Sequence, residues 1–73
     1  MLRRKPKKRE FVITLMTNPP GRVITNTFMG TWRHGGSWLE CYQGIRDGAI
    51  EEWKRMGTDV NEESIVTSFF AME

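Results

Sequence analysis

The clearest hydrophobic pattern in the chain lies between Ser37 and Gly57. Apolar side chains recur there at three- and four-residue intervals, at Trp38, Tyr42, Ile45, Ala49, Trp53 and Met56. On a helix of 3.6 residues per turn, this spacing forms a single stripe. Ser37 and Glu40 match a capping box at the start, and Gly57 suits a left-handed cap at the end. The segment is therefore predicted to be an amphipathic helix that packs its aromatic stripe on another element.

Three other segments alternate between two sets of side chains with a period of two, which is the pattern of β-strands. They cover residues 10–16, 22–32 and 64–72. Between the first two, Pro20 and Gly21 match the central pair of a type II turn, so these strands are expected to form a hairpin. A helical turn is expected to begin near Asn61. In the last segment, the alternation leaves open whether Phe69 or Phe70 faces the helix.

The order strand, strand, helix, strand predicts an α+β fold in one unit, residues 10–73. A crossover through the helix would bring the last strand beside the first. The result is a three-stranded antiparallel sheet of order 2-1-3 with the helix on one face. The side chains between the two layers are the predicted core: Phe11, Ile13, Leu15, Ile24, Phe28, Trp32, Trp38, Tyr42, Ile45, Ala49, Trp53 and either Phe69 or Phe70.

One helix covers only one side of such a sheet, so the other side is expected to face water. The expected residues there are half threonine and half apolar: Val12, Thr14, Met16, Thr25, Thr27, Met29 and one apolar pair of the last strand. Monomeric proteins rarely leave a large surface of this kind unused. We therefore expect either a homodimer through this open face or another molecule that covers it.

Charge is distributed unevenly along the chain. Six of the eleven basic residues stand in positions 1–9, whereas residues 10–73 hold the other five and all nine acidic residues, a net charge of −4. Positions 1–9 are therefore predicted to be a disordered basic arm. Its charge density is typical of contacts with DNA or RNA phosphates, although a solubilising tail or an address signal has a similar composition. The predicted nucleic-acid-binding residues are Arg3, Arg4, Lys5, Lys7, Lys8 and Arg9, with Arg22 and Arg33 in the folded unit.

The residues before the helix are a second candidate site. The amides of a helix N-terminus bind anions, so His34, Gly35, Gly36 and Ser37 form a candidate anion site. The lysine and the spacing of a P-loop are missing, and a plain connection that ends in an N-cap is the simpler interpretation.

Two further features have alternative interpretations. Gly44 and Gly48 flank the helical stripe and are either tolerated surface positions or points where another element approaches closely. Among the three tryptophans, Trp32 is the one best placed to be exposed and to stack on a base.

Residue types for catalysis or metal binding are scarce. His34 is the only histidine, and Cys41 is the only cysteine, which excludes an internal disulfide and a cysteine zinc cluster. We expect no enzymatic activity, no cofactor and no metal. No apolar run has the length of a membrane span, so no membrane association is expected. A lone cysteine, best read as a small buried thiol, weakly favours a reducing compartment, and we expect a cytoplasmic protein.

These features favour a small non-enzymatic nucleic-acid-binding or regulatory module whose arm contacts phosphates without reading bases. The competing hypothesis is a protein-interaction or inhibitor domain of the kind found among small mobile-element proteins. Such a domain would bind a partner protein through its acidic helix face or its open sheet face.

Overall fold

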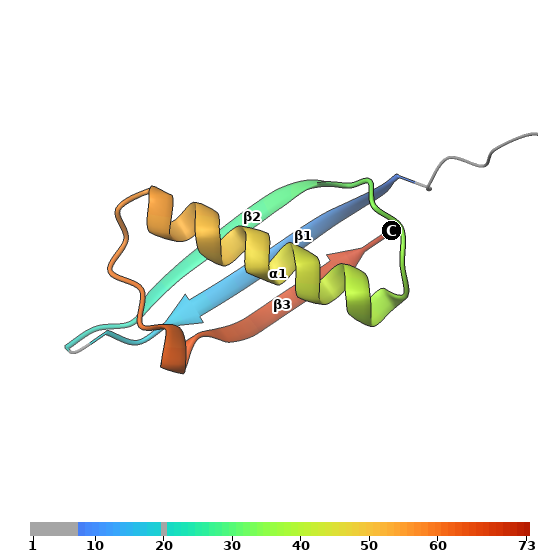
Figure 1. Cartoon of the computed structure of the whole chain (residues 1–73). Helices are drawn as coiled ribbons and strands as arrows, with labels where there is room; N and C mark the ends of the chain where they lie inside the picture. Colours follow the sequence, from blue (N-terminus) through green and yellow to red (C-terminus); the bar gives the residue numbers. More distant parts are fainter. Residues whose placement is uncertain (1–7, 20) are drawn as a thin grey trace, which may run out of the picture.

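The computed structural model describes residues 8–19 and 21–73 (Figure 1). Strands β1 (Arg9–Thr17) and β2 (Ile24–Trp32) form a hairpin and are followed by the helix α1 (Trp38–Arg55). A 3-10 turn, η1 (Glu62–Ser64), then leads into strand β3 (Val66–Met72). The sheet order is β2-β1-β3, and β1 is antiparallel to both neighbours. The predicted α+β fold of order 2-1-3 is confirmed.

The element boundaries differ slightly from those expected. β1 begins at Arg9, which pairs with Trp32, so Arg9 belongs to the sheet and not to the predicted arm. β2 begins at Ile24 and β3 at Val66, each two residues later than expected. Of the predicted arm, residues 1–7 lie outside the described residues.

Both ends of α1 have the caps that the sequence indicated. The hydroxyl of Ser37 accepts the Glu40 amide at 3.1 Å, and the Glu40 carboxylate accepts the Ser37 amide at 2.9 Å. At the other end, Gly57 has a φ of 84° and the Thr58 amide donates to the Trp53 carbonyl at 3.4 Å. These bonds satisfy backbone groups that a helix leaves unpaired at its ends.

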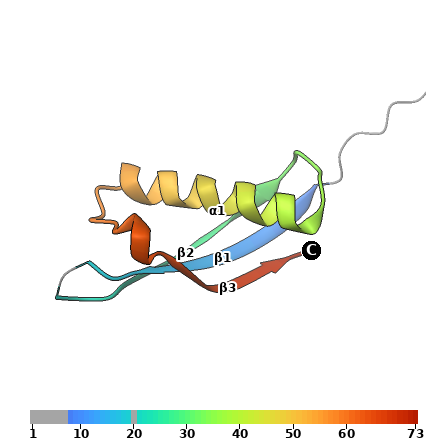
Figure 2. The ribbon, with the colours of Figure 1, turned by 60° about the horizontal axis from the view of Figure 1, so that its bottom comes forward.

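The core lies between α1 and the inner face of the sheet (Figure 2). Phe28 of β2 packs edge-on against Trp53 of α1, with ring centroids 6.1 Å apart. Ile50 and Ile65 are also buried, although the spacing of the stripe did not indicate them. The buried apolar residues are Ile13, Leu15, Cys41, Ile45, Ala49, Ile50, Trp53 and Ile65. Burial of one large side chain of this kind contributes about 1.5–3 kcal/mol.

Trp38 contradicts the predicted core, because its side chain is 57% exposed. The helix crosses the sheet obliquely, and its first turn lies past the β3 edge (Figure 1). The Trp38 ring stacks on Tyr42 at a centroid distance of 5.8 Å and meets Phe70 edge-on at 5.2 Å. It therefore covers the rim of the core and does not lie inside it.

A bulge in β3 decides which phenylalanine faces the helix. The register passes from Thr14↔Phe69 to Leu15↔Thr67, which leaves Ser68 as an extra residue. Thr67 and Phe70 consequently share the inner face, and the Thr67 hydroxyl lies 2.6 Å from that of Tyr42. Phe69 is 54% exposed on the opposite face. One inserted residue reverses the alternation, so a strict period of two misassigns half of the strand.

Gly44 allows Trp32 to pack against the helix. A Cβ atom at position 44 would overlap the Trp32 ring, and the indole Nε1 donates to the Gly35 carbonyl at 2.9 Å. Trp32 is therefore half-buried and packs against the core, as its place in the predicted core indicates, and the alternative of an exposed Trp32 that stacks on a base is not supported. A Cβ at Gly48 would have no atom within 4 Å. The close approach comes from the chain's own second strand, and only at Gly44.

Thr17 joins the end of β1 to the loop before β3. Its side chain is fully buried. Its Oγ1 accepts the Asn61 amide at 3.0 Å and donates to the Asn61 carbonyl at 3.1 Å. Asn61 also caps η1, since its side chain accepts the Glu63 amide. This connection confirms the helical turn expected near Asn61 and explains how the loop is held to the sheet.

The two helix glycines should respond oppositely to substitution by alanine. We expect Gly44→Ala to lower the free energy of unfolding by about 1–3 kcal/mol, because the new methyl group must displace the Trp32 ring. Gly48→Ala should raise it by up to about 1 kcal/mol, since alanine is the better helix former. Urea unfolding followed by tryptophan fluorescence measures both, and equal stabilisation by the two substitutions would contradict the packing at Gly44.

Substitution of Thr17 should also change the stability of the protein. We expect Thr17→Val to lower the free energy of unfolding by about 1–3 kcal/mol, because the part-buried Asn61 amide loses the hydroxyl that accepts its hydrogen bond. Thr25→Val, at an exposed position of β2, is the matched control and should change stability little. Chemical denaturation of both variants tests this, and a neutral Thr17→Val would show that the bonds to Asn61 are not important.

Candidate functional site

The side of the sheet opposite α1 is an uncovered, uncharged surface within the described residues (Figure 2). We call it the open sheet face. The bulge places Val66, Phe69 and Ala71 there, which answers the question that the alternation left open. Met29 is 76% exposed, and the hydroxyls of Thr14 and Thr27 lie 2.9 Å apart. The face consists of Val12, Thr14, Met16, Thr25, Thr27, Met29, Val66, Phe69 and Ala71.

Strand register arranges these nine side chains in three rows across β2, β1 and β3. Each row has a larger side chain at one edge of the sheet and a smaller one at the other. The larger one is on β2 in the first row and on β3 in the next two. The rows are Met29–Val12–Ala71, Thr27–Thr14–Phe69 and Thr25–Met16–Val66.

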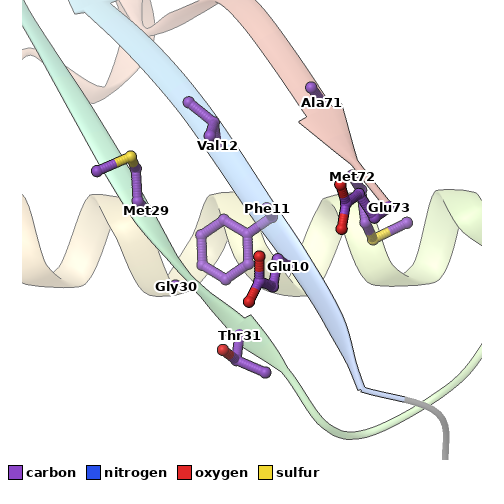
Figure 3. A pocket seen from close by; sticks show the side chains of 9 residues that line it. All are labelled: Glu10, Phe11, Val12, Met29, Gly30, Thr31, Ala71, Met72 and Glu73. Atoms are coloured by element: carbon purple, nitrogen blue, oxygen red, sulfur yellow. The ribbon is translucent and has the colours of Figure 1, made fainter.

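A hollow of about 480 Å³ borders the first row (Figure 3). Figure 3 shows Met29, Val12 and Ala71 projecting from three neighbouring strands. Gly30 belongs to its floor, where a Cβ atom would lie 3.0 Å from the Phe11 ring. That atom would point to the helix side of the sheet, where Phe11 packs against the core. On the open sheet face, it is the small side chain of Ala71 that leaves space in the row of Met29.

Three of the predicted phosphate-binding residues meet at one end of the sheet. Lys8 and Arg33 line the same surface, together with Glu10 and Glu73. Arg9 pairs with Trp32, the residue before Arg33. Among the described residues, no carboxylate lies within ion-pair distance of Lys8, Arg9 or Arg33.

Arg22 does not join this group. It follows the hairpin turn, where Gly21 has a φ of 87° and the Arg22 amide donates to the Pro19 carbonyl at 3.2 Å. Nine residue pairs separate this end of the hairpin from the Arg9 end, a distance of about 27 Å at the usual rise per residue. The sequence alone treated Arg22 and Arg33 alike, whereas the hairpin places them at opposite ends.

Other cations of the folded unit already have partners. Lys54 pairs with Glu62 at 2.7 Å and with Glu51 at 3.7 Å, and Arg55 pairs with Glu52 at 2.9 Å. The hydrogen bond from Lys54 to Glu62 is the main reason why the Lys54 pKa is raised. These pairs partly neutralise the acidic face of the helix.

At the candidate anion site, the chain's own carboxylate occupies the helix N-terminus. The Glu40 carboxylate accepts the Ser37 amide, and this bond, followed by that of the Ser37 hydroxyl, lowers the Glu40 pKa from its ordinary 4.5. The Gly35 carbonyl points inward to Trp32, and His34 packs edge-on against the same indole at 4.9 Å. An external anion would therefore meet a negative charge at Ser37.

Reactive side chains are not grouped elsewhere in the described part of the chain. Cys41 is buried, as expected, and its thiol donates to the Gly35 carbonyl at 3.2 Å. No set of three or more histidine, cysteine or acidic side chains among residues 8–19 and 21–73 is arranged to hold a metal ion. The one described α-helix is too polar to cross a membrane.

The capping box at Ser37 and Glu40 predicts how the Glu40 carboxyl titrates and how stability changes at low pH. We expect the Glu40 carboxyl to titrate below 4.5 in the folded protein, because the Ser37 hydrogen bonds favour its charged form. Its stabilising contribution should be present above pH 4.5 and should be lost as the pH falls through the lower, folded pKa. Carboxyl NMR titration measures this shift. Ser37→Ala removes the hydroxyl and keeps the backbone amide, which is the larger cause, so the Glu40 pKa should move only part of the way toward 4.5. A full return to 4.5 would contradict the assignment.

Comparison with known proteins relates the chain to no established group. No family model, no curated protein and no solved structure matches it. The function proposed below therefore depends on the residues and geometry of this chain alone.

Proposed function

We propose that this protein is a small non-enzymatic nucleic-acid-binding module whose basic N-terminal segment contacts phosphates without reading bases. The observation that carries the proposal is the position of Arg33 beside Lys8, at the end of the sheet where β1 begins. At this end of the sheet, the run of cations that starts at Arg3 continues onto the folded unit. A lone buried Cys41 supports a cytoplasmic location for such a module.

The distribution of charge supports one direction of approach. The exposed face of α1 and the loop after it carry Asp47, Glu51, Glu52, Asp59, Glu62 and Glu63. Phosphates would be repelled from that side and attracted to the end that holds Lys8 and Arg33. Each neutralised phosphate releases a counterion, so six arm cations and Arg33 acting together would make binding fall steeply with salt.

Neutralisation of the arm tests the proposal in the full chain. We expect Arg3→Gln, Arg4→Gln, Lys5→Gln and Lys7→Gln together to weaken binding of a labelled duplex at about 50 mM salt. The slope of log affinity against log salt should become shallower by about 3–4, at about 0.9 per lost phosphate contact. Fluorescence anisotropy at about 50 mM and about 200 mM salt measures both quantities.

Two single substitutions add a matched control. Arg33→Gln should reduce the salt slope by about 1. Arg22→Gln removes the same charge at the opposite end of the hairpin and should have little effect. Two results would exclude the proposed function. One is a wild-type chain that binds neither duplex nor single-stranded probes at low salt. The other is a variant with a neutralised arm that binds as tightly as the wild-type chain.

A second candidate function is the protein-interaction or inhibitor domain of the small mobile-element type. The exposed apolar side chains of Met29, Val66 and Phe69 on the open sheet face favour it. The acidic helix face is a weaker candidate surface, because Glu51, Glu52 and Glu62 already pair with Lys54 or Arg55. If the wild-type chain binds no nucleic acid in the titration, this second function is favoured.

A further inference from the structure

We propose that the open sheet face binds a second copy of this chain, with the twofold axis of the dimer running along β1. The two sheets would pack face to face with their strands roughly aligned, and the two α1 helices would lie on the outside. The nine residues of the face include no predicted phosphate contact, so the dimer does not rest on the nucleic-acid function, although Lys8 and Arg33 border both surfaces.

Complementary side-chain size is the main reason for choosing a second copy. Rotation about an axis along β1 keeps the position along the strands and exchanges the two edges of the sheet. Each row of one copy therefore faces the same row of the other copy. Strand β2 of one copy then lies over β3 of the other. Met29 would then lie over Ala71 of the second copy, and Phe69 over its Thr27. Each row pairs its larger edge residue with its smaller one, and the hollow beside Ala71 provides space for a methionine.

Charges at the margin of the face fit the same axis. Arg33 extends from the β2 edge and Glu73 from the β3 edge, at levels two residues apart along β1. Exchange of the edges would bring Arg33 of one copy close to Glu73 of the other. Glu10 would lie near the axis, opposite its own counterpart, with Lys8 of both copies next to it. The interior rows contain no charge that would need a partner.

The size of the face sets the expected strength of the dimer. The three rows, together with the charged row of Thr31, Glu10 and Glu73 beside them, cover about 14 Å by about 27 Å at standard strand spacings. Each copy would bury on the order of 500 Å², which places the interface at the lower end of the specific range. Small interfaces of this kind are typical of weak, reversible association, so we expect monomer and dimer to interconvert at micromolar concentrations.

The parallel arrangement has one consequence for binding. An axis along the strands brings the two Lys8–Arg33 ends together at one end of the dimer. If the proposed function holds, the two basic arms would start side by side and would increase affinity for a long nucleic acid by avidity. A short probe that reaches only one arm would not gain from dimerisation.

Sedimentation equilibrium of the full chain tests the surface. The wild-type protein should change from 8.5 kDa to twice that mass across the micromolar range. Met29→Glu should raise the dimer dissociation constant at least tenfold, because each dimer would bury two unpaired carboxylates. Met56→Glu is the matched control: it makes the same chemical change at a methionine that is 58% exposed at the end of α1, and it should leave dimerisation unchanged.

A size exchange within one row tests the axis. Met29→Ala and Ala71→Met should each weaken the dimer, and the double variant should recover most of the wild-type affinity. An axis perpendicular to the strands would instead place Met29 over Thr25 of the second copy, and the double variant would then show no recovery.

Three results would overturn the proposal. One is a chain that remains monomeric at about 500 µM. Another is a dimer whose dissociation constant is unchanged in Met29→Glu, or rises as much in Met56→Glu as in Met29→Glu. In either case the contact between the copies would lie elsewhere. The third is a monomer whose nucleic-acid affinity falls on Met29→Glu, because the face would then be a nucleic-acid surface. Circular dichroism of each variant confirms that the fold is retained.

Discussion

The structure depends on the burial of one helix stripe against the inner face of a three-stranded sheet. Ile13 and Leu15 from the central strand meet Ile45, Ala49 and Trp53 from the helix, and all five are almost completely buried. The caps at Ser37 and Gly57 limit the helix to the length that crosses the sheet. Because one helix can cover only one face of a sheet, the same interaction that stabilises the core also leaves the opposite face open. Both the stability and the interaction surfaces of the protein follow from this asymmetry.

The same arrangement of helix and sheet places the charged residues on different parts of the surface. The acidic residues of the helix and the following loop lie on one outer side, where Lys54 and Arg55 neutralise part of them. The middle of the open sheet face has no charge, whereas Lys8 and Arg33 share one end of the sheet with Glu10 and Glu73. The apolar middle and the charged end are therefore chemically different surfaces on one small protein.

Two features show how local contacts compensate for a small core. Thr17 is the one buried polar side chain among the described residues, and its hydroxyl bonds to the backbone of Asn61 and to the Ser64 hydroxyl. Gly44 has no side chain, so the Trp32 indole can pack against the helix backbone. Each feature joins segments that are far apart in the chain. Neither has a periodic pattern that would reveal it before the fold is known.

The sequence by itself determined the element order, the sheet order, the helix caps and most of the core, because these depend on periodicity and on residues within a few positions of one another. It also determined the open face and the uneven charge. Tertiary structure decided what depends on contacts between distant segments. The oblique crossing of the helix exposed Trp38, the Ser68 bulge assigned Phe70 to the core and Phe69 to the surface, and the length of the hairpin separated Arg22 from Arg33. A period of two or 3.6 contains no information about crossing angle, bulge position or the distance between strand ends, which are set only when the layers pack.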